Sequence, residues 1–196
     1  NNSDLSKYLA KLFPSEVSKT ILSNCLLFHH QLYKKVIENS ANNESLSIII
    51  ELQKIISYYK LGDYKSVVKF EKLVDVNNDS DLNLETIHHI ASSYYYLGQF
   101  VNSKRLNEIL INLSSIKRNK RYLLEGIFLK GSILSNEGKL EAAENIFQKA
   151  RPILMEYNDL EMEAKYFWAL GEIAQKKLDP TEAIENFRKA WEVFLS

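Results

Sequence analysis

The chain has few of the residues that cross-link small domains or bind metals. Its 196 residues include one cysteine, three prolines and six glycines. The single thiol, Cys25, builds neither an intrachain disulfide framework nor a cysteine-rich zinc site, and we expect it to pack as a small buried side chain. The scarcity of cysteine is typical of a reducing compartment, so we predict a cytoplasmic protein.

An excess of charge of one sign is also absent. Lys plus Arg and Asp plus Glu each number 25, so the formal net charge is zero. Nucleic-acid-binding domains normally carry a basic excess, so we expect no direct nucleic-acid partner. No apolar run approaches the roughly 18 residues that span a bilayer, and the first residues lack the pattern of a signal peptide, so we expect no membrane association.

Catalytic motifs are missing as well. The sequence contains no nucleophile elbow, no P-loop and no dinucleotide-binding glycine pattern. Neighbouring carboxylates such as Glu141 and Glu144 lie one helical turn apart on a polar face and are interpreted as solvated surface. We therefore predict that the chain is not an enzyme and has no cofactor.

The four histidines form two adjacent pairs, His29-His30 and His88-His89. Adjacent helical residues point about 100° apart, so neither pair can hold one metal ion from a single helix face, and we predict no metal site. His88 has two interpretations. It either meets a ligand as a group that titrates near neutral pH or is an ordinary surface or interhelix histidine.

The chain does contain an internal repeat. The stretch "SYYKLGDY" returns 36 residues later as "SYYYLGQF". The turn residues Gly62, Gly98, Gly138 and Leu178 are 36, 40 and 40 residues apart. A period of this length is the signature of a solenoid of helical hairpins.

Each unit is predicted to be two amphipathic helices around a short turn. The apolar stripe of one second helix has the spacing of a helical face: Leu140, Ala143, Phe147, Ala150, Leu154 and Tyr157. We expect paired helices to approach closely at Gly131 and Gly171. We expect the turn glycines to lie where the backbone needs a positive φ. Asp179 is a predicted N-cap followed by proline. Across two turns, Tyr58 and Tyr94 are expected to pack on Tyr64 and Phe100.

These units resemble the tetratricopeptide repeat, in which small residues of the first helix, a turn glycine and an Ala-aromatic-Ala stripe recur. The matching residues are Leu170, Gly171, Ala183, Phe187 and Ala190 in the last unit and Gly131, Gly138, Ala143, Phe147 and Ala150 in the unit before. The resemblance covers Leu46 to Ser196. It implies an all-α fold, namely a right-handed superhelical α-solenoid of antiparallel helix pairs, and a module that binds protein or peptide.

Some residues depart from the family pattern. Val67 and Ser103 stand where alanine is usual, and Pro152 interrupts a helical stripe, so we expect a kink or distortion there. The 40-residue spacing is similar to the long-helix variant found in kinesin light chains, cell-polarity adaptors and Gram-positive quorum-sensing peptide receptors.

The repeat predicts a division of the chain into a cap and four hairpins. Residues 1–45 are interpreted as an N-terminal helical cap or a degenerate repeat, with a short helix through Leu5 and Phe13 that Pro14 breaks and a long helix from Ser15 to about Val36. The hairpins are predicted at 46–81, 82–119, 120–157 and 158–196.

The first helices of stacked hairpins line a concave groove, which gives the candidate binding site. The residues expected there are Leu52, Ile56, Tyr59, His88, Ser92, Tyr95, Phe128, Ser132, Ser135, Trp168, Glu172 and Gln175. This lining suits a partner with apolar anchors. Part of it has a second interpretation, packing against the cap or a neighbouring helix. The Lys, Asn and Arg set by which chaperone-binding repeats capture a C-terminus is missing.

Two further stretches bear on partners. The basic run "IKRNKRY" at Ile116–Tyr122 is either a solvated linker or a contact for a phosphate or an acidic partner. The last helix is expected to expose Trp191, Val193 and Phe194. Because a solenoid needs a polar cap, we expect either more chain or another subunit to cover this edge, which makes a homo-oligomer one alternative.

The function predicted from these features is a non-enzymatic, peptide-binding regulatory part of a larger protein. The alternative is a constitutive scaffold or self-association domain of a multiprotein assembly. The two are distinguished by whether a short peptide changes the shape of the free protein.

Overall fold

The computed structural model describes residues 16–41 and 47–196, and all regular elements in them are helical. The helices are α2 (Glu16–His29), α3 (Tyr33–Ala41), α4 (Ile48–Lys60), α5 (Tyr64–Val67), η1 (Val68–Leu73), α6 (Asp81–Tyr96), α7 (Phe100–Lys117), α8 (Lys120–Asn136), α9 (Leu140–Tyr157), α10 (Leu160–Lys176) and α11 (Pro180–Leu195). The predicted short helix before Pro14 and the N-cap at Ser15 lie outside the described residues.

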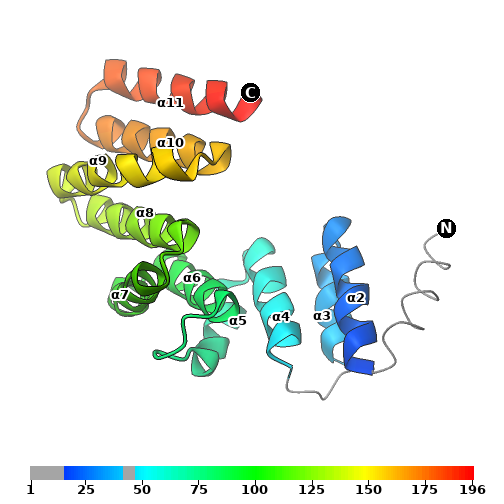
Figure 1. Cartoon of the computed structure of the whole chain (residues 1–196). Coiled ribbons are helices and arrows are strands. Elements are labelled where there is room, and N and C mark those ends of the chain that lie inside the picture. The colour runs from blue at the N-terminus through cyan, green and yellow to red at the C-terminus, as the bar shows by residue number, and fades with distance from the viewer. Residues whose placement is uncertain (1–15, 42–46) are drawn as a thin grey trace.

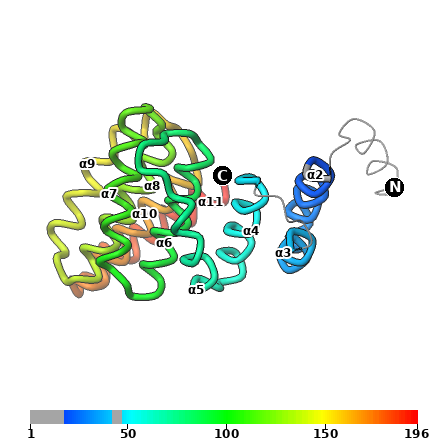
Figure 2. The backbone as a smooth tube through the Cα atoms, turned by 90° about the horizontal axis from the view of Figure 1, so that it is seen from below, coloured from blue at the N-terminus to red at the C-terminus, as the bar shows by residue number. Residues whose placement is uncertain are grey.

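The helices pack in chain order and form an arc (Figure 1). Helices α4, α6, α8 and α10 contact one another in succession, whereas α7 and α9 each contact their own first helix and the first helix of the next unit. The first helices therefore make an inner layer and the second helices an outer layer. This arrangement is the predicted all-α solenoid. Seen from below, the pair α2–α3 continues the arc beside α4 (Figure 2).

Left-handed backbone at the turns is confirmed. Gly62, Gly98 and Gly138 have φ angles of 75°, 71° and 76°. Leu178 adopts φ 63° at the equivalent position of the last unit, where an L side chain is unfavourable. The N-cap at Asp179 is also confirmed, because its Oδ1 accepts a hydrogen bond of 3.0 Å from the backbone N–H of Glu182.

The aromatic contacts across the turns come from different tyrosines than predicted. The ring of Tyr59 lies 5.6 Å from that of Tyr64, and Tyr95 lies 5.8 Å from Phe100. Tyr58 and Tyr94, one residue earlier, point about 100° away around the helix. Tyr58 instead packs near Phe70 and Tyr94 bonds to Glu71. The prediction was wrong by one helical position.

Close approach of the paired helices depends on glycine. A Cβ atom at Gly131 would lie 2.5 Å from the ring of Phe147, and one at Gly171 would lie 2.7 Å from Phe187. Ala143, Ala150 and Phe147 are fully buried beneath α8. The expected stripe on α9 is thus the surface that packs on its partner helix.

The first hairpin departs from the expected pair of long helices. After Gly62 the chain makes only the four residues of α5 and then the 3₁₀-helix η1. The loop that follows is attached to α6 by Asn83, whose Nδ2 donates to the carbonyls of Asp75 and Asn78 while its Oδ1 accepts from the N–H of Asp75. Hydrogen bonds to the Asn83 side chain therefore satisfy loop backbone groups that a longer helix would have paired within itself.

The predicted long helix after Ser15 is divided in two. The chain reverses at Gln31, which has a φ of 55°, so that α2 and α3 form a further hairpin. Asn24 of α2 joins three helices: its Nδ2 donates to Ser40 Oγ on α3 at 2.9 Å and to Gln53 Oε1 on α4 at 2.8 Å. Cys25 is exposed, so its predicted burial was wrong.

Pro152 does not end its helix. Helix α9 continues through it to Tyr157, and the Pro152 side chain is exposed. Ser103, which replaces the usual alanine, is fully buried and donates its hydroxyl to the carbonyl of Ala91 at 2.8 Å. The hydroxyl is accommodated because the neighbouring helix offers it an acceptor.

Candidate functional site

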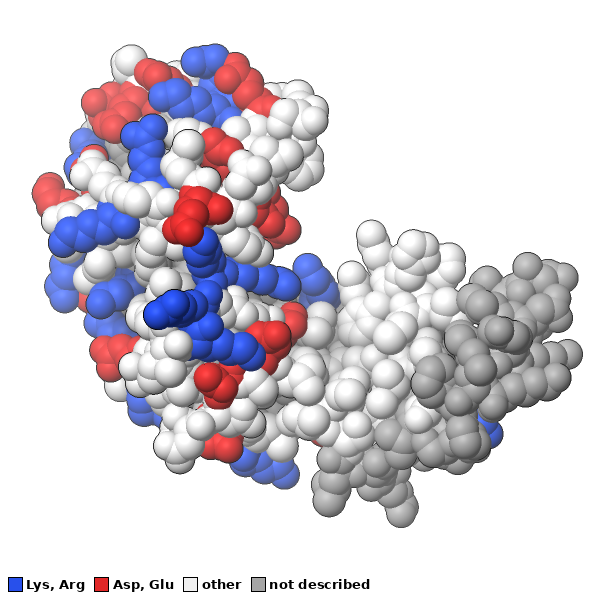
Figure 3. Space-filling view, viewed as in Figure 1, with Lys and Arg blue, Asp and Glu red and all other residues white. Residues whose placement is uncertain are grey.

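A pocket opens in the inner layer where three successive first helices meet. Its volume is ≈ 250 Å³, and its lining comes from α6, α8 and α10 with one ring from α9: Tyr95, Ser132, Ser135, Asn136, Phe147, Ala169, Glu172, Ile173, Gln175 and Lys176. In the space-filling view the concave side of the arc opens between α10–α11 and α4, and basic and acidic side chains alternate along it (Figure 3).

A chain of hydrogen bonds crosses this pocket from α10 to α6. Lys176 Nζ donates to Ser135 Oγ and to Asn136 Oδ1, each at 2.9 Å. Asn136 Nδ2 donates to Tyr95 Oη at 2.6 Å. The network holds the ammonium of Lys176 against the α8 wall and links three units through their side chains.

Glu172 occupies the other part of the pocket lining. Its Oε1 accepts a hydrogen bond of 3.1 Å from the indole Nε1–H of Trp168, one turn earlier on α10. Burial raises the pKa of the Tyr95 phenol, and the nearby Glu172 carboxylate raises it further. Tyr95 is therefore a neutral hydroxyl that can donate a hydrogen bond at physiological pH.

Several predicted groove residues meet in this pocket. Tyr95, Ser132, Ser135, Glu172 and Gln175 all line it. Trp168 lies beside it, is 55% exposed and packs with its ring 5.0 Å from Phe187. Except for Ser135, which is buried, these residues form the part of the expected groove that solvent reaches.

Other predicted groove residues lie in helix packing. Leu52, Ser92 and Phe128 are buried, and the ring of Phe128 lies 5.6 Å from that of Phe147. Ile56 is half-buried on α4. For these positions the interhelix interpretation describes the environment better than exposure to a ligand.

Tyr59 belongs to an aromatic cluster beside the groove. Its ring lies 4.8 Å from His89 and 6.2 Å from Tyr96. Tyr96 stacks on Tyr64 at 4.6 Å and is 55% exposed. The repeated tyrosine motif thus supplies a wall of rings whose outer member is open to solvent.

His88 does not titrate near neutral pH. Burial lowers its pKa to about 3, assisted by the positive charges of Lys165 and Arg121. Its Nδ1 is buried without a hydrogen-bond partner among the described residues, and its ring neighbours His89 at 5.1 Å. The interhelix interpretation therefore holds.

Sequence reasoning missed Asn136 and Lys176. These two residues and Tyr96 are each 40 residues apart and follow directly after Tyr95, Ser135 and Gln175. The predicted columns stopped one residue before the end of each first helix. Extending each column to the residue before the turn would have found the lysine.

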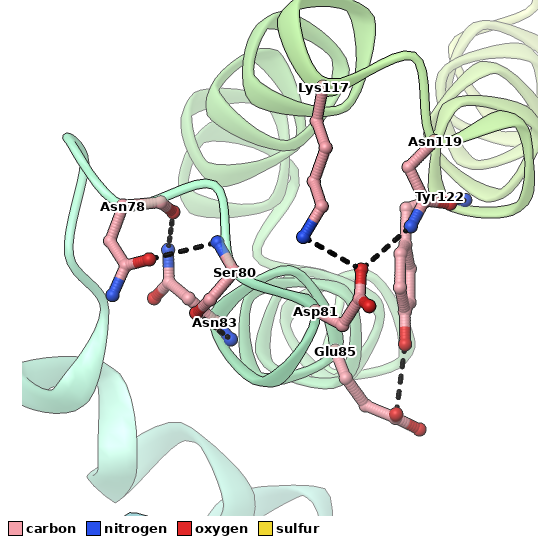
Figure 4. A network of polar contacts seen from close by, with 8 residues as sticks. All are labelled: Asn78, Ser80, Asp81, Asn83, Glu85, Lys117, Asn119 and Tyr122. Atoms are coloured by element: carbon pink, nitrogen blue, oxygen red, sulfur yellow. Dashed lines mark hydrogen bonds and ion pairs between the residues drawn. The ribbon is translucent and has the colours of Figure 1, made fainter.

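The basic run Ile116–Tyr122, which spans the end of α7 and the start of α8, makes several contacts within the chain. Asp81 at the start of α6 accepts from Lys117 at 3.1 Å and from Asn119 Nδ2 at 2.9 Å, and Tyr122 Oη donates to Glu85 at 2.9 Å (Figure 4). Lys120 pairs with Glu156 at 2.5 Å. The run positions α8 against α6, which favours the linker interpretation over a phosphate site.

The outer face of α11 exposes aromatic side chains. Trp191 and Phe194 are 62% and 75% exposed, and their stacked rings lie 6.3 Å apart. Val193, the third residue predicted for this edge, is half-buried.

Within the described ranges, no three His, Cys, Asp or Glu side chains gather as metal ligands do. A search of the same part of the chain for a helix long and apolar enough to cross a membrane finds none.

Comparison with known families agrees with this geometry. The model of the tetratricopeptide repeat matches residues 124–150, which run from α8 into α9 and contain the Gly131–Phe147 contact. Searches among curated proteins and among solved structures find no match. Residues 124–150 therefore resemble a tetratricopeptide repeat, and the described helices form an α-solenoid similar to those built from such repeats, an architecture that serves protein–protein interaction in general.

Proposed function

We propose that the concave face of this solenoid binds a polypeptide in an extended or helical form. The main observation behind this proposal is that α6, α8 and α10 contribute polar side chains to one shared pocket, flanked by exposed aromatic rings. A groove that combines aromatic anchors with a few fixed polar groups is typical of peptide recognition.

Trp168 is the most informative residue for a test. It is half-exposed beside the pocket and fixed by its contacts with Glu172 and Phe187. Trp191 is its matched control, because it is a similarly exposed tryptophan on α11. Peptides selected from a random library on the wild-type chain are titrated against Trp168→Ala and Trp191→Ala by calorimetry.

We expect Trp168→Ala to weaken binding by about 2 kcal/mol or more, as truncation of an aromatic hot spot does, and Trp191→Ala to leave it unchanged. Circular dichroism checks that both variants fold. If the folded Trp168→Ala variant binds the peptides with the affinity of the wild type, the proposal that they bind in the groove is wrong.

A regulatory role adds a further requirement. Peptide binding must then change the arc, since a ligand shifts conformation only through different affinity for two states. Small-angle scattering with and without a selected peptide measures this change. An unchanged radius of gyration at saturation argues for a constitutive scaffold.

The exposed face of α11 favours a second candidate, self-association. Adjacent exposed aromatic rings on one helix face are typical of a contact surface. Light scattering across a concentration series tests it: association that Trp191→Ala abolishes and Trp168→Ala retains supports the scaffold, and a monomer at all concentrations excludes it.

A further inference from the structure

We propose that the pocket between α6, α8 and α10 takes the carboxylate of an acidic side chain within the bound polypeptide, and that Lys176 binds it. The inference rests on the proposed function, because it names the chemistry of the anchor in that groove.

The α8 wall of the pocket is rich in hydrogen-bond donors. Lys176 directs two N–H groups to Ser135 Oγ and Asn136 Oδ1, and an ammonium has three. The oxygens of Ser135 and Tyr95 accept bonds from Lys176 and Asn136. Each hydroxyl also keeps an O–H that can donate, and Ser132 of the same lining is a further hydrogen-bond partner of Tyr95. Such a wall complements a group that only accepts hydrogen bonds. Among side chains the ionised carboxylates of Asp and Glu are of this kind, and their charge is opposite to that of the Lys176 ammonium.

Lys176 also has a fixed position and no ion-pair partner among the described residues. No carboxylate of the described residues lies within ion-pair distance of its ammonium, whereas Lys177 pairs with Glu144 and Lys165 pairs with Glu125 and Glu161. Glu172, at the i−4 position where a partner would be expected, is bound by the Trp168 indole. Because the ammonium is already fixed by two hydrogen bonds, a ligand orders little on binding it.

The dimensions of the pocket favour a side chain. Its volume of ≈ 250 Å³ is below the roughly 300 Å³ at which pockets for separate small molecules begin. The single positive charge of Lys176 faces one negative charge on Glu172 in the same lining. Glu172 repels both a carboxylate and a phosphate, but the carboxylate carries one negative charge and the phosphate nearly two, so the repulsion is weaker for the carboxylate.

Exposed aromatic rings lie on both sides of the pocket. Tyr96 is on α6 and Trp168 on α10, with α8 between these helices. A polypeptide that contacts both rings passes over the pocket, so the carboxylate comes from an internal Asp or Glu and not from the chain end.

Selected peptides that contain one acidic residue provide the test. For each peptide, the dissociation constant is measured with its acidic residue and with the matching amide, on the wild type, Lys176→Met and Lys177→Met. A charged hydrogen bond is worth about tenfold or more in affinity. We expect the amide analogue to bind the wild type about tenfold or more weakly, and the acidic peptide to bind Lys176→Met more weakly by the same factor. The amide analogue should bind Lys176→Met no more weakly than either change alone predicts, and Lys177→Met should bind the acidic peptide as the wild type does.

Three results would overturn the inference. They are equal binding of the acid and amide peptides, tighter binding of a phosphoserine analogue, and loss of affinity only when the peptide C-terminus is amidated. In each of these cases binding still depends on Trp168 if the proposed function is right. Binding that is insensitive to Trp168→Ala marks the failure of the proposed function itself.

Discussion

At the scale of single residues, buried polar side chains define which surfaces meet. Asn24 of α2 binds Ser40 of α3 and Gln53 of α4, and Asn107 donates from Nδ2 to the carbonyl of Gly126 at 2.8 Å between α7 and α8. A buried polar group costs stability when it is left without a partner. These residues therefore disfavour alternative pairings of the helices more than they add to the total stability.

His88 and His89 make the stability of the protein dependent on pH. Burial lowers the pKa of His88 to about 3 and that of His89 to about 4 from an ordinary value of 6.5. The unfolded chain binds these protons below pH 6.5 while the folded chain does not. Their contribution is therefore complete above pH 6.5 and is lost as the pH falls toward 4, at up to about 1.4 kcal/mol per pH unit for each histidine.

Urea unfolding between pH 7 and pH 5 measures this dependence, because most carboxylates remain ionised in that range. His88→Phe keeps a ring against Tyr122 but removes one titration, so we expect the slope to fall by about half. The control is His29→Phe at an exposed site. An unchanged slope in His88→Phe would show that the histidine is accessible to protons in the folded state.

At the scale of helices, glycine sets how closely the pairs approach. Gly131 faces the fully buried Phe147, whereas Gly171 faces Phe187, which is only partly buried and lies beside Trp168. The same substitution should therefore have different costs in two equivalent hairpins, because only the second ring has room to move.

Alanine at Gly131 should lower the free energy of unfolding by up to about 2 kcal/mol, since overpacking costs about 1–3 kcal/mol and the better helix propensity returns about 1. Gly171→Ala should be close to neutral. Equal destabilisation in denaturant titrations would show that the last hairpin is as rigid as the one before it.

Comparison of these elements shows what sequence can predict. The third and fourth hairpins could be predicted from the sequence pattern. Their small residues allow close approach of the helices, their aromatic residues pack between the helices, and their turn residues adopt positive φ. The first hairpin does not, because the break after Val67 depends on Asn83, which binds the loop from a different helix. The chain reversal at Gln31 could not be predicted either, because no glycine or proline lies at that turn.

The candidate site was predictable in part. Helical periodicity places Tyr95, Ser132 and Glu172 on one face of their helices, and these residues do meet. Burial of Leu52 and Phe128 depends on how tightly successive units stack, which periodicity does not report. The position of Lys176 depends on hydrogen bonds across two helices, which only the folded structure brings together.

At the scale of the whole molecule, the arc presents two surfaces of different character. The concave face combines rings with fixed polar groups, and the outer face of α11 exposes Trp191 and Phe194. The chain contains two tryptophans, and one lies on each surface. A single spectrum can therefore distinguish the two surfaces.

That spectrum is the most direct test of binding in the groove. In a ¹⁵N–¹H correlation experiment the two indole N–H signals are assigned with Trp168→Phe and Trp191→Phe, and a selected peptide is titrated into the wild type. Because the Trp168 indole donates to Glu172 at the pocket, its signal should shift to saturation while that of Trp191 stays. A saturating titration that moves only Trp191, or neither signal, would contradict binding on the concave face.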